Sequence, residues 1–244
     1  MAIARPLNRS GALVARMHPN RLIAALPSAD RRQLLEALQT VSLTVGQPLY
    51  EAGEPIKFVY FPVSGVYSIV STVTDGDTVE VVTVGNEGMV GIPVFLGGRS
   101  TPDEAFCQMP GELLRMRAAH FRGEAHRSRA LHTVMLRYTQ AFIHQIVQRA
   151  ICDHLHSIVE RCASWLLMTH DRGNVGELVL TQESLALMLG VRRATVTAAA
   201  GMLQRAGSIR YTRGRITIVD REKLRRASCQ CDRIVHREYK RLLG

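Results

Sequence analysis

The sequence predicts an α+β fold in three parts: an N-terminal antiparallel β-roll of the double-stranded β-helix (jelly-roll) type, a long dimerisation helix, and a C-terminal winged helix-turn-helix. Short β-rich runs fill residues 41–116, a long helical pattern follows, and residues 181–218 read as helix, turn, helix and hairpin. The expected divisions are a flexible tail (1–18), the β-roll (19–128), the dimerisation helix (129–156) and the winged helix-turn-helix (157–244).

The N-terminal part begins with helical spacing and then changes to short strands. Apolar residues predict a helix over Leu22–Leu38 that breaks near Pro27, with Ser28 capping its second half. Six β-rich runs follow: Pro48–Tyr50, Phe58–Pro62, Val66–Val73, Thr78–Val84, Ala105–Gln108 and Leu113–Met116. Turn signals such as Ser64-Gly65 and Asp75-Gly76-Asp77 separate them. Strands at this close spacing are typical of an antiparallel roll or barrel.

A helical pattern from about Arg129 to His170 carries two apolar stripes. The first comprises Leu131, Met135, Tyr138, Phe142 and Ile146, and the second comprises Leu136, Ile143, Val147, Ile151 and Leu155. One stripe can pack on the roll, and the other then calls for a second copy of the chain. The residues assigned to the dimer helix are Met135, Tyr138, Phe142 and Ile146. The alternative is a helix buried within one subunit.

Residues 181–218 predict a winged helix-turn-helix. Thr181 is expected to cap a short helix, and Gly190 to supply the positive φ of the turn. A second helix over Arg193–Arg205 would turn Val196, Met202 and Leu203 inward. Strands at Ile209–Tyr211 and Arg215–Ile218 then form a basic hairpin. Side chains at the start of such a recognition helix reach base edges in the major groove. The expected contacts to double-stranded DNA are Thr181, Gln182, Arg192, Arg193, Thr195, Thr197, Arg213 and Arg215.

Charge is concentrated in the same part of the chain. Residues 171–244 hold 15 Lys and Arg against 7 Asp and Glu, and so carry +8 of the formal net charge of +10. A local excess of this size attracts the phosphate backbone and makes affinity fall with salt. A solvated basic surface is the alternative, and the helix-turn-helix spacing argues against it.

Composition narrows the class of protein further. No window approaches the roughly 20 apolar residues of a membrane span, and the N-terminus has no continuous apolar segment of a secretory signal. Five cysteines, an odd number, favour reduced thiols in a cytoplasm. The chain shows no nucleophile elbow, P-loop or zinc-hydrolase motif, so we expect no enzyme.

The order of roll, long helix and winged helix-turn-helix resembles the Crp/Fnr superfamily of bacterial transcription regulators. The similar stretches are Leu49–Pro55, Phe61–Gly65, Gly85–Gly91 and Leu189–Val196. The resemblance implies a cyclic-nucleotide-binding-like sensor roll, a homodimer on a roughly palindromic site, and contact with RNA polymerase. It also implies a hinge near Leu155–Ser157. A signalling module that acts through protein contacts is the alternative function.

Departures from the family pattern concern the effector and the DNA half-site. The stretch Gly85–Gly91 resembles the family's effector cassette. The cyclic-AMP branch has a Glu shortly after the last glycine of this cassette, but here Gly91 is followed by Ile92-Pro93. Where that branch has an Arg-Ser pair for the phosphate, Asp103-Glu104 would repel it. By resemblance, with Arg99-Ser100 as a substitute pair, the effector-pocket residues are Glu87, Gly88, Met89, Gly91, Arg99, Ser100 and Thr101. A small-molecule effector other than cyclic AMP, or a roll without effector, both remain open.

The recognition helix departs from the cyclic-AMP branch as well. Ala194 and Ala198 stand where that branch has a Glu and a further Arg, both of which read bases. A different half-site is therefore expected, with Arg192 and Arg193 as the base or phosphate contacts.

Cysteine spacing predicts no metal site. Cys229 and Cys231 are separated by one residue rather than the usual two, with His236 five residues on. Cys152 and His156 share a helical face, but two ligands are too few for a site. An Fnr-type iron–sulphur cluster is disfavoured because no cysteine precedes Cys107. Packing or surface thiols are the favoured interpretation, and no cofactor is assigned.

Overall fold

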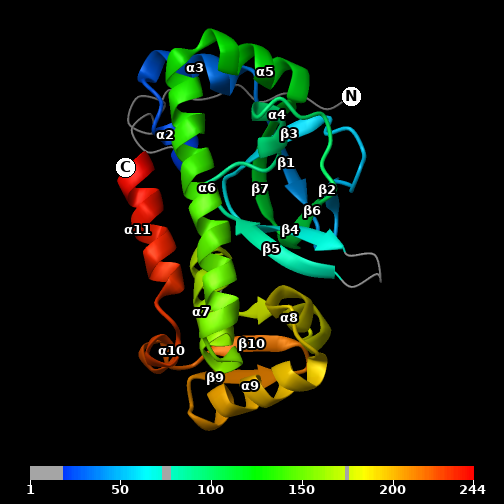
Figure 1. Ribbon diagram of the computed structural model, residues 1–244, viewed down its shortest axis with the longest axis vertical. Coiled ribbons are helices and arrows are strands. Elements are labelled where there is room, and N and C mark those ends of the chain that lie inside the picture. The colour runs from blue at the N-terminus through cyan, green and yellow to red at the C-terminus, as the bar shows by residue number, and fades with distance from the viewer. Residues whose placement is uncertain (1–18, 73–77, 174–175) are drawn as a thin grey trace, which may run out of the picture.

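A computed structural model describes residues 19–72, 78–173 and 176–244. The β-roll lies at one end, the winged helix-turn-helix at the other, and one long helix runs between them (Figure 1). This confirms the predicted α+β class and the order of its parts. The expected flexible tail (1–18) and the turn at Asp75-Gly76-Asp77 lie outside the described residues.

Two short helices, α2 (Arg21–Ala24) and α3 (Ser28–Glu36), precede the roll. Asn20 caps α2, because its Oδ1 accepts a hydrogen bond from the Ile23 amide at 3.2 Å. Its side-chain amide also donates to the carbonyls of Pro62 and Gly88, both at 2.9 Å, and so ties α2 to the roll. Pro27 takes the cap position of α3, and Ser28 is its first helical residue. The expectation that Ser28 caps this helix was therefore wrong.

The roll consists of two antiparallel sheets. One has the order β1-β7-β3 and the other β2-β6-β4-β5. The strands are β1 (Gln39–Leu43), β2 (Pro48–Tyr50), β3 (Phe58–Pro62), β4 (Val66–Thr72), β5 (Thr78–Val84), β6 (Glu104–Met109) and β7 (Gly111–Arg117). All six predicted runs are strands, and β1 is an addition. Helices α4 (Ile92–Phe95) and α5 (Ala118–Arg127) complete the roll.

Helix α6 (Arg129–Leu155) packs its first apolar stripe inside its own subunit. Met135 and Tyr138 are fully buried, Phe142 is 8% exposed, and Ile146 is packed against the same core. These four residues were predicted to make the dimer contact, and this placement corrects that assignment. The second stripe is the exposed one, with Leu136, Ile143, Val147, Ile151 and Leu155 between 42% and 75% exposed.

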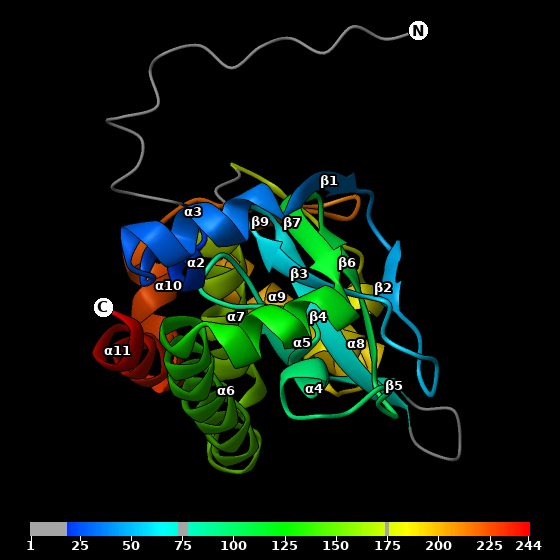
Figure 2. The ribbon, with the colours of Figure 1, turned by 90° about the horizontal axis from the view of Figure 1, so that it is seen from above.

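The C-terminal helix α11 (Cys231–Leu243) explains part of this burial. It lies alongside α6 in both views (Figures 1 and 2). Val235 and Tyr239 enter the core that α6 shares with the roll, and the Tyr239 hydroxyl donates to Gln145 Oε1 at 2.8 Å. A helix buried against both the roll and α11 has only one long face left for solvent.

The C-terminal part has a core of its own. Helix α6 ends at Leu155 and α7 (Ile158–Gly173) begins three residues later, which confirms the break that the resemblance implied. Then follow β8 (Leu178–Val179), α8 (Gln182–Leu189), α9 (Arg193–Arg205), β9 (Ile209–Thr212), β10 (Arg215–Ile218) and α10 (Arg221–Ala227). Val196 and Leu203 are buried as predicted, whereas Met202 is 51% exposed and corrects its inward assignment. None of the described helices combines the length and apolar content that a membrane crossing demands.

Candidate DNA-binding surface and effector region

The turn between α8 and α9 is fixed by local interactions. Thr181 Oγ1 accepts a hydrogen bond from the Ser184 amide at 3.0 Å, which satisfies a free donor at the start of α8. Gly190 ends the helix at φ 63°, in the left-handed region that glycine adopts without a Cβ clash. Both features are as predicted, and together they set the angle at which α9 leaves α8.

The start of α9 presents polar side chains to solvent. Arg192, Arg193, Thr195 and Thr197 are all exposed. Val196, Ala199 and Leu203 of the same helix are buried in the C-terminal core. The helical spacing of these three apolar residues therefore orients the polar positions toward solvent.

A small network holds the polar side chains in place. Gln182 Oε1 accepts hydrogen bonds from Thr197 Oγ1 at 3.0 Å and from Arg193 Nε at 3.3 Å. Arg193 also forms a 2.7 Å ion pair with Glu183 in which both side chains are well exposed. An exposed pair of this kind is worth little, so a phosphate or a guanine can replace Glu183 at low cost.

The wing completes the surface. Arg213 and Gly214 form the tip between β9 and β10, both with positive φ. A groove of about 580 Å³ lies between the wing and helices α8 and α9. Five of the eight predicted DNA contacts line it: Thr181, Gln182, Arg193, Thr197 and Arg213. Arg215 pairs with Glu177 at 2.7 Å beside the groove. Helix α9 and the wing strands, which contribute to the groove, lie at the end of the molecule opposite the roll (Figure 1).

The residues expected to form an effector pocket are not gathered around one cavity. Gly88, Met89 and Gly91 are buried, whereas Arg99 and Ser100 are exposed. A Cβ on Gly88 would lie 2.7 Å from the Tyr138 hydroxyl, and that hydroxyl donates to the Met89 carbonyl at 2.9 Å. These residues pack α6 onto the roll.

The remaining cassette residues also have structural partners. Glu87 forms a 2.7 Å ion pair with Arg172 of α7, and the Thr101 hydroxyl donates to Asp103 at 3.0 Å. Of the four main cavities in the described part of the chain, none is lined by more than one of the seven predicted pocket residues. A pocket shared by these seven residues stays a prediction. Around Glu87, Gly88 and Met89, the contacts described come from α6 and α7.

Comparisons with protein families assign both halves of the molecule. Residues 40–128 match the family described as "Cyclic nucleotide-binding domain", and residues 160–227 match that described as "Crp-like helix-turn-helix domain". The two segments follow each other in the order that the fold shows. The chain belongs to the Crp/Fnr superfamily of transcription regulators.

Solved structures of this superfamily share the fold. FixK2 from Bradyrhizobium japonicum is 18% identical, with a TM-score of 0.67, and the match covers 79% of this chain and 98% of that one. A putative transcriptional regulator of the Crp/Fnr family from Eubacterium rectale is 19% identical, also with a TM-score of 0.67, and the match covers 85% and 95% of the two chains. The c-di-GMP-responsive regulator CLP from Xanthomonas campestris is 14% identical, with a TM-score of 0.63 and coverage of 79% and 99%. No curated protein matches the chain at a significant level.

Within this Crp/Fnr chain, a buried polar contact links the roll to the DNA-binding half. Glu80 of β5 accepts hydrogen bonds from Ser68 Oγ at 2.7 Å and from Trp165 Nε1 of α7 at 3.0 Å. Burial raises the pKa of the Glu80 carboxyl, and the nearby Arg149 opposes that rise. This contact could not be predicted from the sequence, because an isolated glutamate in a strand is typical of a solvated position.

Proposed function

We propose that the chain is a cytoplasmic, sequence-specific DNA-binding regulator of transcription that acts as a homodimer on a palindromic promoter site. One observation carries the proposal: the start of α9 and the tip of the wing present Arg193, Thr197 and Arg213 around one open groove. This arrangement suits a recognition helix in the major groove with a basic wing on the adjacent phosphates. At the promoter, the dimer would contact RNA polymerase.

The exposed stripe of α6 supports the homodimer. Leu136, Ile143, Val147 and Ile151 lie along one face of the helix at 42–56% exposure. A row of large apolar side chains in water is unfavourable, and a second copy of the same helix would cover it with a self-complementary contact. Two-fold pairing would also place two recognition helices on half-sites about one DNA turn, roughly 34 Å, apart.

The trigger in this proposal is not cyclic AMP. Gly91 leads directly into α4 through Ile92 and Pro93, so no carboxylate follows it to bind a ribose. Glu87 is held by Arg172, and the carboxylate of Asp103 accepts a bond from Thr101 where a phosphate would need positive charge. The effector is therefore a different small molecule, or the roll transmits no small-molecule signal.

Selection of bound sites from random duplex DNA tests the function directly. The purified chain is expected to enrich a two-fold symmetric sequence without added cyclic nucleotide. Enrichment only with cyclic AMP would overturn the effector proposal. If no sequence is enriched and binding shows no salt dependence, the protein acts through protein contacts instead.

Arg193→Ala tests the assigned contact. It should weaken binding to the selected site by roughly 1–3 kcal/mol, since Arg193 would lose a base or phosphate contact. Arg32→Ala is the matched control, because Arg32 is an exposed arginine on α3. Titration of labelled duplex by fluorescence anisotropy measures both variants. Equal affinity of Arg193→Ala and the wild type would refute the assignment.

A further inference from the structure

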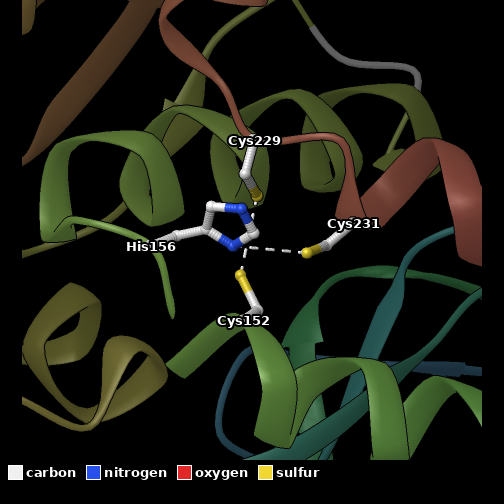
Figure 3. A group of neighbouring side chains, drawn as sticks. All are labelled: Cys152, His156, Cys229 and Cys231. Atoms are coloured by element: carbon white, nitrogen blue, oxygen red, sulfur yellow. Dashed lines mark hydrogen bonds between the residues drawn. The ribbon is translucent and has the colours of Figure 1, made fainter. Parts of the chain in front are cut away.

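Four metal-ligating side chains meet at the hinge between α6 and α7. Cys152 lies in the last turn of α6 and His156 in the link to α7. Cys229 comes from the link between α10 and α11, and Cys231 is the first residue of α11 (Figure 3). One ligand atom from each residue lies within 4.8 Å of all the others. The pair Cys152 and His156 and the pair of cysteines near α11 each provide too few ligands alone. The fold brings the two pairs together, although Cys152 and Cys229 are 77 residues apart in the sequence.

The separations match the ligand set of a single tetrahedral ion. Cys152 Sγ lies 3.5 Å from Cys229 Sγ, and Cys231 Sγ lies 3.5 Å from His156 Nδ1. Bonds of about 2.3 Å to sulphur and about 2.0 Å to nitrogen give a tetrahedron with edges of roughly 3.5–3.8 Å. The side chains therefore need only small rotations to enclose an ion.

Packing alone does not account for the cluster. The three cysteines are buried, at 5–7% exposure, but they form a separate group outside both apolar cores of the described chain. Gln148 Nε2 donates to Cys231 Sγ at 3.2 Å, a contact that favours a thiolate and orients a ligand. Cys231 is also the first residue of the 13-residue helix α11, whose N-terminal dipole stabilises negative sulphur.

We propose that Cys152, His156, Cys229 and Cys231 form a Cys₃His site for Zn²⁺. Three thiolates and an imidazole suit zinc, whereas magnesium and calcium require oxygen ligands. A [4Fe–4S] cluster needs its ligands further apart, because each binds a different iron. Binding one zinc ion displaces the protons of the thiols that are still protonated, so affinity falls as the pH is lowered.

The ion would cross-link the segments that meet at the hinge between α6 and α7. It would join the end of α6 to the start of α11, whose Val235 and Tyr239 enter the core that α6 shares with the roll. The pKa of Cys229 is lowered to about 5, chiefly by the hydrogen bond from Cys152, with Ser164 of α7 acting in the same direction and burial opposing them. The site is separate from the DNA-binding groove, so it stands whether or not the proposed function holds.

Metal analysis of the purified full chain tests the site. We expect inductively coupled plasma mass spectrometry to find one zinc ion per chain. When Co²⁺ replaces zinc, we expect the visible absorption bands of tetrahedral, thiolate-bound cobalt. Cys229→Ala and Cys231→Ala should lose both signals. Cys107→Ala and Cys162→Ala are matched controls, since these cysteines are also fully buried but lie elsewhere, and they should keep both.

A second measurement covers the case in which the cluster variants fail to fold. Wild-type protein stripped with a chelator should show faster amide hydrogen exchange in α11 and in the link before it, with unchanged exchange in the roll strands, and added Zn²⁺ should reverse the change. Absence of zinc together with absence of the Co²⁺ spectrum in folded wild type would overturn the proposal. A Cys152–Cys229 disulfide in protein purified without reductant, with no bound metal, would overturn it as well.

Discussion

The two apolar faces of α6 carry similar side chains, but one face is buried and the other is exposed. On the inner face, Met135 and Tyr138 are fully buried by the roll and by α11. On the outer face, Ile143 and Val147 are 56% and 48% exposed. The difference comes from what each face meets inside the chain. Apolar periodicity identifies a face that needs a partner, but it does not say whether that partner belongs to the same molecule.

The faces also differ in their polar contacts. Tyr138 donates to the Met89 carbonyl, and Gln145 donates to the Thr83 carbonyl at 3.1 Å while accepting from Tyr239. Such buried hydrogen bonds fix the inner face in one register. The large apolar side chains of the outer face can form no such bonds and stay exposed in the described chain, which suits a contact formed only between copies. Substitutions should therefore affect folding on one face and assembly on the other.

The largest effect is expected at Tyr138. Tyr138→Ala removes a fully buried ring that packs near Phe142 and Tyr239. The loss of burial and the cavity left behind should cost about 3–5 kcal/mol of unfolding free energy. Tyr138→Phe keeps the ring and should cost only about 1–3 kcal/mol, since it leaves the Met89 carbonyl unpaired. Chemical denaturation of the full chain measures both; an unchanged midpoint for Tyr138→Ala would contradict the burial.

The next effect is expected on assembly. Ile143→Asp places a charge in the middle of the outer stripe, so a helix pair would have to bury it unpaired. We expect the dimer dissociation constant to rise at least about tenfold, with subunit stability within about 0.5 kcal/mol of wild type. Sedimentation velocity over a range of concentrations measures the change. Val45→Asp is the control, because Val45 is 64% exposed and lies in the roll. Equal association of Ile143→Asp and wild type would place the dimer contact elsewhere.

Local signals explain which parts of the fold could be predicted. The bounds of β2, β3, β5 and α9 coincide with the predicted runs, because strand alternation, turn residues and helical spacing act within a few neighbouring residues. The Thr181 cap and the Gly190 turn are local in the same sense. The exposed DNA-facing positions of α9 follow from its buried positions, which the same spacing reveals.

Long-range contacts explain what could not be predicted. The inner face of α6 could not be identified without α11, whose Tyr239 lies far along the chain yet reaches Gln145. The close packing of Tyr138 on Gly88 could not be predicted either, because the two residues are far apart in the sequence. The cysteine cluster needed Cys152 and Cys229 to meet across the fold. The spacing of residues within one segment cannot predict such contacts between distant segments.

A smaller, pH-dependent effect on the free energy of unfolding is expected at Glu80, which lies close to the inner face of α6. Glu80 is fully buried near Arg149 of α6, and burial raises its pKa above the value of 4.5 that it has when unfolded. An acid with a raised folded pKa contributes stability when protonated, and that contribution is lost as the pH rises above about 4.5 through the folded pKa. The stability of Glu80→Gln relative to the wild type should therefore increase as the pH rises. Denaturation midpoints at about pH 5 and about pH 8 measure this; a constant difference between the two proteins would contradict it.

The smallest effect is expected at the end of the outer stripe. Leu155 is the last residue of α6 and is 75% exposed, more than the stripe residues in the middle of the helix. Residues at the rim of an interface contribute little, so Leu155→Ser should change the dimer dissociation constant by less than about threefold and stability by less than about 0.5 kcal/mol. The same sedimentation series measures it beside Ile143→Asp. A tenfold change would extend the contact between copies to the hinge, and the outer face would then be an assembly surface over its whole length.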